Sequence, residues 1–356
     1  MAKRIALFCH KGGVGKTTTT FNLAWMLADK GKKVLMVDAD SQCNLTALVM
    51  GEEQFELFYQ EANPQNIKNA LLPAFKGRAT LIQPVECFEI IDNKNLFLLP
   101  GHLGLSEYET TLSFAQTSPD AIFTLQNIPG AFSYLCTETA KKYDVDYILV
   151  DMSPSLSAIN QNLLMTSDYF IIPTSPDYFS IMAIDSMSEV LPRWATWASK
   201  FMSMEALTEE ALYSLPIIKP KFLGAVVQRL GRRYGETTNQ FQLAIDNIGQ
   251  CIIEHLLPDL RKKELCFAPE RYDDILGGNN IFLAKIPEFG QLNSLSQKNN
   301  KAIFALLDTE MTFNNEETGR EIPYTGSILK NINKKKEDLK NIFSEFANFV
   351  IQLTKI

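Results

Sequence analysis

The segment His10-Lys11-Gly12-Gly13-Val14-Gly15-Lys16-Thr17-Thr18 decides the fold of this sequence. An apolar run, Arg4–Cys9, precedes it, and a stretch with helical spacing, Lys16–Lys30, follows it. Glycines let the backbone wrap closely around an anion, so that successive N–H groups and the positive end of the next helix point at phosphate oxygens. We therefore predict a phosphate-binding loop between a strand and a helix, with residues 12–18 contacting the phosphates. The alternative, a purely structural turn, is disfavoured by the Gly-Lys-Thr ending.

Two side chains of this loop have predicted roles in binding, and two others depart from the ordinary Walker pattern. Lys16 is expected to pair with the β- and γ-phosphates, and the Thr17 hydroxyl is expected to bind Mg²⁺. His10 stands where the ordinary Walker pattern has glycine, and Lys11 is an additional lysine. The loop is therefore a variant of that pattern.

Short apolar runs recur along the chain and indicate strands. They are Arg4–Cys9, Val34–Val37, Leu96–Leu99, Tyr147–Val150, Phe170–Ile172, Phe222–Val227 and Ile281–Ala284. Helical spacing between them is clearest after the loop, where Phe21, Ala24 and Leu27 share one face and Gly31 suits a left-handed C-cap. Strands separated by helices imply a mostly parallel sheet covered on both faces. The predicted fold is therefore α/β, a doubly wound sheet.

Four segments fit this alternation poorly. We expect residues 1–356 to form a single domain with insertions at about 51–94, 106–140, 196–218 and 308–330. Each insertion is rich in Pro, Asn, Gln, Glu or Thr. A second domain is the alternative, and decoration of one domain is the simpler interpretation.

The end of the chain is predicted to be a helix over about residues 337–354. Its apolar residues lie on one side: Ile342, Phe343, Phe346, Phe349, Val350 and Leu353. The basic run Lys334–Lys336 precedes this face instead of lining it, as a membrane-surface helix would require. We therefore expect the helix to dock against the core, with a membrane anchor as the alternative.

Composition limits the class of protein. The chain has 356 residues, of which 46 % are hydrophobic and 21 % charged, as in ordinary globular domains. No apolar run is long enough for a membrane span or a secretory signal, so we expect a soluble protein that is not exported. The six cysteines form no CxxC pair and the three histidines lie far apart in the sequence, which fits a reducing cytoplasm and shows no zinc site. The net charge of −7 argues against bulk coating by nucleic acid.

At this point the motifs resemble a known family. The loop Lys11–Thr18, with its early lysine, is similar to the deviant Walker A motif of the ParA/MinD/Soj class of P-loop ATPases. The segment Val37–Asn44 resembles that family's second motif, and Ile148–Leu156 resembles its Walker B strand and the following turn. The resemblance runs from residue 1 to about 305 and includes the last helix.

The sequence departs from the family pattern at several turns. Ser41 and Cys43 replace the usual Pro and Gly, and Ser153 replaces the first Pro after Walker B. These exchanges alter the stiffness of the turns and leave nucleotide binding intact. They affect the assignment to a subfamily and the expected rate of ATP hydrolysis. The family's arginine-rich stretch after the late Ile-Pro is missing at Pro287, which weakens the inference of a typical partner surface.

The resemblance implies an ATPase that uses ATP and Mg²⁺. Asp151 would hold the metal through a water, Asp38 would support the metal shell and Asp40 would orient the attacking water. Pro287 would flank the base of the nucleotide. The structural alternative is a helix-capping role for Asp151, before Pro154, and for one of Asp38 and Asp40.

Lys11 is the residue from which the resemblance implies a mechanism. In the family, the matching lysine reaches across a two-fold interface to the phosphates of the partner subunit and supplies charge as an arginine finger does. The implied assembly is a homodimer that forms on ATP binding and separates after slow hydrolysis. A solvated lysine beside the loop is the alternative.

DNA is a further partner that the resemblance implies. Residues 219–263 carry eight basic and four acidic residues, a net +4 on an acidic chain. Arg229, Arg232 and Arg233 are the first candidates for phosphate contacts, and surface solvation explains them equally well. The expected location is the bacterial cytoplasm, in association with the nucleoid if DNA is bound.

The leading role is partition or positioning of DNA, as in plasmid partition or chromosome segregation, or of another cargo, with a ParB-like or other activating partner. A regulatory ATP switch that acts on a partner protein or at the membrane is the alternative. Iron–sulfur relatives need cysteines soon after Walker B or a CxxC near the C-terminus, and tyrosine autokinases end in a tyrosine cluster where this chain has Tyr324 alone. Both of these classes are disfavoured.

Overall fold

A computed structural model describes residues 2–78, 80–117, 123–230, 232–233, 236–237, 239–278, 280–314 and 320–355. Its centre is an eight-stranded sheet in the order β10-β7-β6-β1-β5-β2-β4-β3. The strands are β1 Lys3–Leu7, β2 Val34–Ala39, β3 Phe88–Glu89, β4 Leu96–Leu99, β5 Tyr147–Met152, β6 Tyr169–Thr174, β7 Lys221–Leu230 and β10 Phe282–Pro287. All pairings are parallel except β3 with β4. All seven predicted strands are confirmed, with ends shifted by at most three residues.

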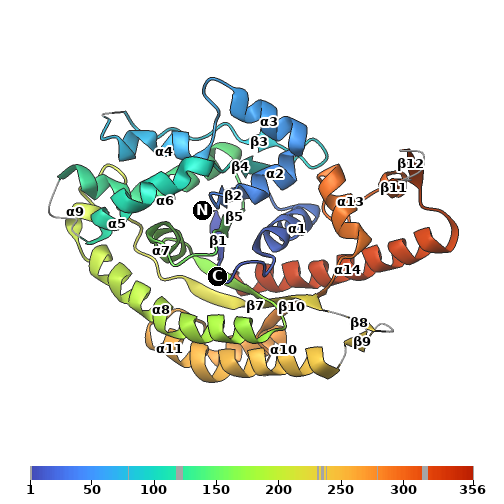
Figure 1. Ribbon diagram of the computed structural model, residues 1–356. Helices are drawn as coiled ribbons and strands as arrows, with labels where there is room; N and C mark the ends of the chain where they lie inside the picture. Colours follow the sequence, from blue (N-terminus) through green and yellow to red (C-terminus); the bar gives the residue numbers. More distant parts are fainter. Residues whose placement is uncertain are drawn as a thin grey trace.

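Helices cover both faces of this sheet, because its central strands are apolar on both sides. Figure 1 shows α1 and α14 on one face and α6 and α7 on the other. The helices are α1 Lys16–Asp29, α2 Asn44–Met50, α3 Glu52–Gln60, α4 Ile67–Phe75, α5 Glu109–Thr117, α6 Ile128–Tyr143, α7 Ala158–Met165, α8 Tyr178–Met202, α9 Glu205–Thr208, α10 Asn239–Cys251, α11 Leu257–Lys262, α12 Pro269–Leu276, α13 Gln291–Asn299 and α14 Gly326–Leu353. Two small hairpins stand outside the sheet: β8 Arg232–Arg233 with β9 Glu236–Thr237, and β11 Thr312–Asn314 with β12 Glu321–Pro323. The arrangement confirms the predicted doubly wound α/β fold.

The predicted insertions are shorter than their expected bounds. The last part of 106–140 belongs to α6, which is the regular crossover from β4 to β5. The first part of 196–218 belongs to α8, which continues to Met202. The segment 51–94 holds α3, α4 and the edge strand β3. Proline and polar residues lower helix propensity, but packing against the sheet overrides that preference in α6 and α8.

The terminal helix begins earlier than predicted. α14 starts at Gly326, so the end of the expected insertion 308–330 is helical, and the Lys334–Lys336 run lies within the helix. Lys336 donates a hydrogen bond to the carbonyl of Leu306, which ties this basic run to the body. The sequence predicts too late a start for this helix, because a run of lysines has no apolar periodicity that would indicate helix.

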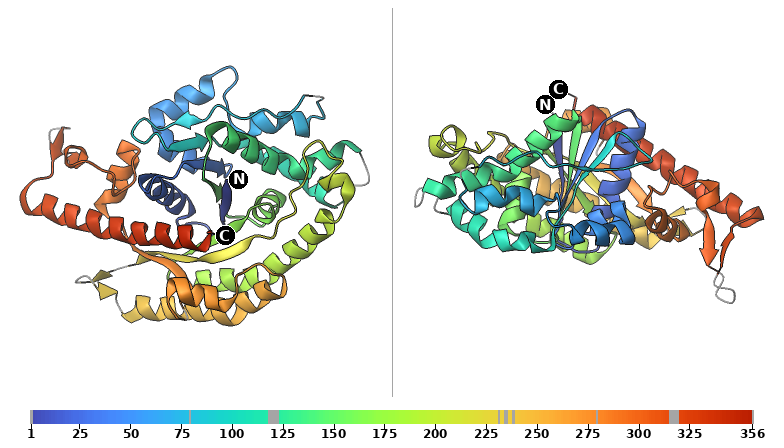
Figure 2. Two further views of the ribbon diagram at one scale, coloured as in Figure 1. Left: turned by 180° about the vertical axis from the view of Figure 1, so that it is seen from behind. Right: turned by 90° about the horizontal axis from the view of Figure 1, so that it is seen from above.

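The apolar face of α14 docks against the core, as expected. Phe343, Phe346, Val350 and Leu353 are fully buried, and the helix packs against α1 and β10. Figure 2 shows α14 lying along the molecule, with one end near the N-terminus of the chain. In the part of the chain that the structure describes, no helix combines the length and apolarity that a membrane crossing requires.

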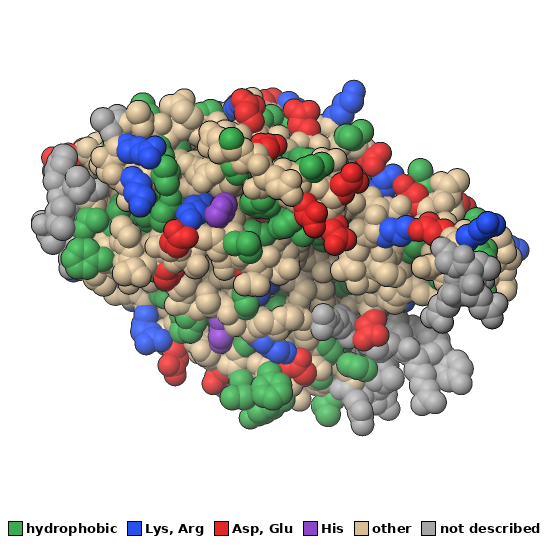
Figure 3. All heavy atoms as spheres, turned by 45° about the horizontal axis from the view of Figure 1, so that its top comes forward, with side chains coloured by type: hydrophobic (Ala, Val, Ile, Leu, Met, Phe, Trp, Pro, Cys, Tyr) green, Lys and Arg blue, Asp and Glu red, His purple; other side chains and the backbone are tan. Residues whose placement is uncertain are grey.

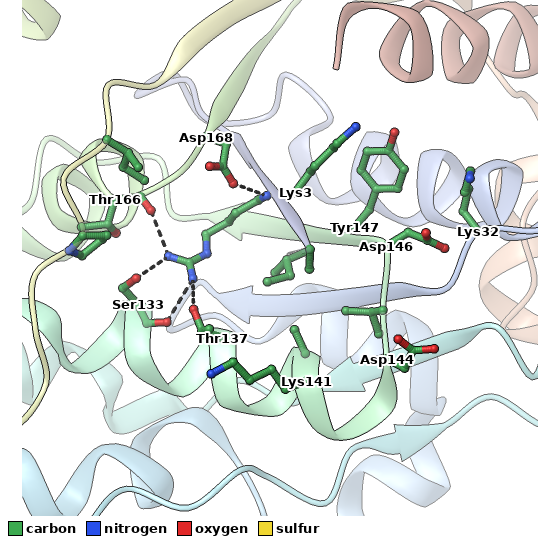
Figure 4. A pocket seen from close by; sticks show the side chains of 17 residues that line it. Lys3, Lys32, Ser133, Thr137, Lys141, Asp144, Asp146, Tyr147, Thr166 and Asp168 are labelled. Carbon is green, nitrogen blue, oxygen red and sulfur yellow. Dashed lines mark hydrogen bonds between the residues drawn. The ribbon is translucent and has the colours of Figure 1, made fainter. Parts of the chain in front are cut away.

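The edge of the sheet where the strands begin is held together by a buried arginine. Nη1 of Arg4 donates hydrogen bonds of 3.0 Å to Ser133 Oγ and to the carbonyl of Thr166, and Nη2 donates to Ser133 O and Thr137 Oγ1 (Figure 4). These bonds tie β1 to α6 and to the turn before β6. Arg4 and its partners line a cavity of about 570 Å³, at the edge of the sheet opposite to the phosphate loop.

Candidate functional site

The predicted phosphate loop connects β1 to α1 at the edge where the parallel strands end. Gly13 and Gly15 have φ angles of +73° and +78°, which only glycine adopts readily. A Cβ atom on Gly15 would collide with Oε1 of Gln228, so a side chain there would also displace the end of the Gln228 side chain. The sequence therefore folds here into a tight turn that leads directly into the N-terminus of α1, the end of a helix that favours anions.

Lys16 lies inside this turn and is buried. Among the described residues, its ammonium group donates hydrogen bonds to the carbonyls of Cys9, at 3.0 Å, and Lys11, at 3.3 Å. Burial lowers the pKa of Lys16 below its ordinary value, while the carboxylates of Asp151 and Asp40 act against this shift. A buried cation next to open loop amides is the arrangement that binds phosphate.

Carboxylates from two adjacent strands meet beside the loop. Asp38 of β2 pairs in register with Asp151 of β5, and both side chains are fully buried. The Thr17 hydroxyl donates to Oδ2 of Asp151 at 2.7 Å, and Thr46 donates to Asp38 from both its amide and its hydroxyl. Asp40 follows β2 and accepts a bond from the amide of Gln42. The predicted metal-binding residues Thr17, Asp38 and Asp151 are therefore brought together.

These carboxyl groups have unusual acidities. Burial, with a smaller contribution from Asp40, raises the pKa of Asp38 to about 6, although bonds from Thr46 lower it. Burial and then the charge of Asp38 raise the pKa of Asp151 to about 8. A divalent cation would relieve both effects, because it compensates for lost solvation and separates the like charges. The donors, hydroxyl and carboxylate oxygens, are those that Mg²⁺ prefers.

We predict that Asp151→Asn stabilises the nucleotide-free protein against heat. A carboxyl group with a higher pKa in the folded state (about 8) than in the unfolded state (3.8) lowers stability as the pH rises between these values. At pH 8 the substitution should raise the Tm by about 2–6 °C, and at pH 4 the difference should disappear. Thermal unfolding across pH measures it. Asp338→Asn, at an exposed position of α14, is the control. An equal Tm for Asp151→Asn and the parent at pH 8 would contradict the prediction.

Two neighbouring cavities surround the loop. One of about 540 Å³ is lined by Gly13, Gly15, Lys16, Thr17, Thr18, Asp40 and Pro154, among others. The second, of about 340 Å³, shares Gly15 and Thr18 and extends to Pro287, Phe289 and Asn293. The first cavity has a cation and hydroxyls in its lining, whereas the second combines the polar side chains of Gln228, Glu288 and Asn293 with Pro287 and Phe289. Pro287, which was predicted to flank the base of the nucleotide, therefore lines a cavity next to the phosphate loop.

The ammonium group of Lys11 is held by residues at the start of α8. This group lies 2.6 Å from Oδ1 of Asp177 and 3.0 Å from the hydroxyl of Ser180. Partial burial acts to raise the pKa of Asp177, but hydrogen bonds from Lys11 and from the Ser180 amide hold it below its ordinary value. Within the single chain, Asp177 therefore restrains the lysine.

Sequence reasoning missed two residues of this site. Gln228 of β7 donates from Nε2 to the carbonyl of Gly15 and to the Thr19 hydroxyl, so it braces the loop from a strand far away in sequence. The sequence feature that could have identified Gln228 is its position as a polar residue directly after the apolar run Phe222–Val227. Asp177 was visible in the sequence, but nothing there indicated its contact with Lys11.

The three arginines predicted to contact DNA come from β7 and the small hairpin that follows it. Arg229 lies in β7 and Arg232 and Arg233 form β8, but the side chains of all three lie outside the described residues. In the same segment, Lys219 pairs with Glu264 and Lys262 with Asp259. These pairs neutralise part of the charge that the sequence places there.

Comparisons with known proteins agree with the fold. Residues 2–200 match the family model AAA_31, described as "AAA domain". An uncharacterised protein of Methanocaldococcus jannaschii is 33 % identical over 187 residues, or 52 % of this chain and 64 % of the relative. The "Chromosome-partitioning ATPase Soj" of Thermus thermophilus is 30 % identical over 190 residues, or 53 % of this chain and 61 % of the relative. These matches thus span less than two thirds of each relative's length.

A solved structure gives the same result for the architecture. The crystal structure of protein DIP2308 from Corynebacterium diphtheriae has a TM-score of 0.63 and 23 % identity, and the match covers 84 % of this chain and 97 % of that one. The family match includes the loop, both aspartate-bearing strands and the start of α8. The chain therefore belongs to this AAA-domain family and is a P-loop ATPase of the ParA/MinD type.

Proposed function

We propose that the protein binds Mg-ATP in the two cavities and hydrolyses it slowly to ADP and phosphate. The observation that carries the proposal is the Thr17–Asp151 contact beside the buried ammonium group of Lys16. Thr17 and Asp151, supported by Asp38, would hold Mg²⁺, which neutralises charge on the phosphates. Lys16 and the loop amides would bind the phosphate oxygens, and Asp40 would orient the attacking water.

The active form in this proposal is a homodimer with two nucleotides between its subunits. Next to Lys11, the start of α8 exposes Tyr178, Phe179 and Met182, with 70, 68 and 53 % of their surface accessible. Large apolar side chains grouped beside a nucleotide site favour an interface that forms when the site is filled. Lys11 would leave Asp177 and reach the partner's phosphates, so that ATP controls assembly. Light scattering with a non-hydrolysable analogue tests this step, because the mass should double.

We further propose partition or positioning of DNA or another cargo as the cellular role, in the cytoplasm and on the nucleoid. The printed name of the Thermus thermophilus relative supports it, as does the basic segment 219–263. On the face shown in Figure 3, acidic and basic side chains are interspersed, so a DNA contact on this face would be local. A ParB-like or other activating protein would stimulate hydrolysis. A regulatory switch acting on a partner protein is the second candidate, and the Tyr178–Met182 surface would suit it.

We predict that DNA binding requires ATP and decreases steeply with salt. Replacing Arg232 and Arg233 together by alanine should reduce the slope of log affinity against log salt by roughly one per lost phosphate contact. Lys334→Ala/Lys340→Ala on α14 removes the same charge elsewhere and is the control. Fluorescence anisotropy with a random-sequence duplex measures both variants. A slope that is flat, or equal in all three proteins, would exclude the DNA role and favour the switch.

A further inference from the structure

A second group of chemically reactive side chains lies away from the nucleotide site, between α8 and the end of α10. Asp185 projects from α8, Cys251 is the last residue of α10, and His255 belongs to the turn that follows, Ile252–Leu256. One ligand atom from each, a carboxylate oxygen, the sulfur and a ring nitrogen, lies within 4.8 Å of the others. Nδ1 of His255 is 2.7 Å from Oδ1 of Asp185.

The backbone at this point has an unusual form that positions the group. Ile252–Leu256 is a π-helical turn, and the amide of Leu257 bonds to the carbonyl of Ile252, five residues back. The cause is Pro258, which has no N–H to donate to the carbonyl of Glu254 and whose ring would collide with it. Such wide turns are rare and are often found at functional sites. Here the turn sets His255 beside α8, against which the whole segment packs.

The donor set favours a borderline-soft metal ion. Thiolate, imidazole and carboxylate are the three ligand types that Zn²⁺ accepts together, whereas Mg²⁺ and Ca²⁺ prefer oxygen alone. Zinc–ligand bonds of about 2.0–2.3 Å at tetrahedral angles separate neighbouring ligand atoms by roughly 3.3–3.7 Å. The observed separations, from 2.7 Å to at most 4.8 Å, bracket this range. The three ligand atoms therefore lie at separations close to those that a bound zinc ion requires.

Exposure of the group suits a site that exchanges metal with solvent. Cys251 is 7 % exposed, while more than half of the side chains of Asp185 and His255 is accessible. The sulfur faces α8, where it lies 3.8 Å from the carbonyl of Ile181. An ion would therefore be held from the protein side by sulfur and from the rim by oxygen and nitrogen, and its fourth position would face water.

We propose that Asp185, Cys251 and His255 form a Zn²⁺ site that clips α8 to the end of α10. Binding replaces the thiol proton of Cys251 by the metal, and the proton is released to solvent. The clip acts two turns into the helix that begins directly after Asp177, the residue that restrains Lys11. It thereby fixes α8, the helix whose first turns expose Tyr178, Phe179 and Met182. The inference does not depend on ATP binding.

The test uses the full chain, freed of metal by a chelator and kept without nucleotide, with Co²⁺ as the spectroscopic probe. About one equivalent of Co²⁺ should bind and give a thiolate-to-cobalt charge-transfer band in the near ultraviolet, and Zn²⁺ should displace it. Cys251→Ser should abolish the band, and Asp185→Asn and His255→Gln should weaken Zn²⁺ binding at least about tenfold. The Tm of the parent should rise with Zn²⁺.

Matched controls make the result specific. Cys87→Ser removes a partly exposed cysteine elsewhere, and Asp246→Asn removes a carboxylate from the outer side of α10; both should leave the band and the affinity unchanged. Absence of the band, or a band that persists in Cys251→Ser, would overturn the proposal. If Cys251→Ser does not fold, His255→Gln decides, because its side chain is exposed. Zn²⁺ affinity equal to that of the parent would then reject the site.

Discussion

Lys16→Ala is expected to remove ATP binding almost entirely. The ammonium group is buried at the centre of the loop, where it would form charge-assisted hydrogen bonds to two phosphates. Loss of about 2–3 kcal/mol corresponds to an affinity that is about 30–150-fold weaker. Titration with a fluorescent ATP analogue measures this, and hydrolysis at fixed ATP should fall to the background rate.

The controls for Lys16→Ala separate binding from folding. The variant should keep the parent's circular dichroism spectrum, because the partners of Lys16 are backbone carbonyls of a loop and not core side chains. Lys141→Ala removes a surface lysine that pairs only locally with Glu138, and it should bind ATP normally. Affinity within threefold of the parent for the Lys16 variant would show that the loop does not hold the phosphates as proposed.

Lys11→Ala is expected to separate nucleotide binding from hydrolysis. Its ammonium group is bound by Asp177 in the single chain, so ATP affinity should change little. If Lys11 supplies charge to the partner's phosphates, hydrolysis should fall by at least about a thousandfold, the range measured for arginine fingers. The dimer formed with a non-hydrolysable analogue should also be lost. Turnover and light scattering on the same sample measure the two effects.

A matched variant tests whether Lys11 must leave Asp177 before the dimer forms. Asp177→Asn keeps the acceptor for the Ser180 amide and so preserves the start of α8, but it weakens the attraction that holds Lys11. The variant should form the dimer at a lower ATP concentration than the parent. Unchanged turnover in Lys11→Ala would show that the lysine is a solvated neighbour of the loop, which is the alternative stated for it.

Local sequence was informative wherever a single segment forms the structure. The seven apolar runs are strands because β-rich apolar residues between turns have few other conformations in which to bury both faces. The loop follows from Gly13 and Gly15, whose left-handed backbone is a property of the residue type. Helix bounds were less certain, as α14 shows, because the lysines at its start carry no periodic apolar signal.

The sequence by itself determined the chemistry of the phosphate loop and the parallel sheet that displays it. Only the tertiary structure decided which distant residues meet: Gln228 against Gly15, Asp177 on Lys11, and His255 beside Asp185. Such long-range contacts depend on how helices and strands pack. Packing in turn is determined by the apolar surface that the whole chain buries. A motif reports the conformation of its own backbone, whereas a contact across the fold requires every intervening element to be in place.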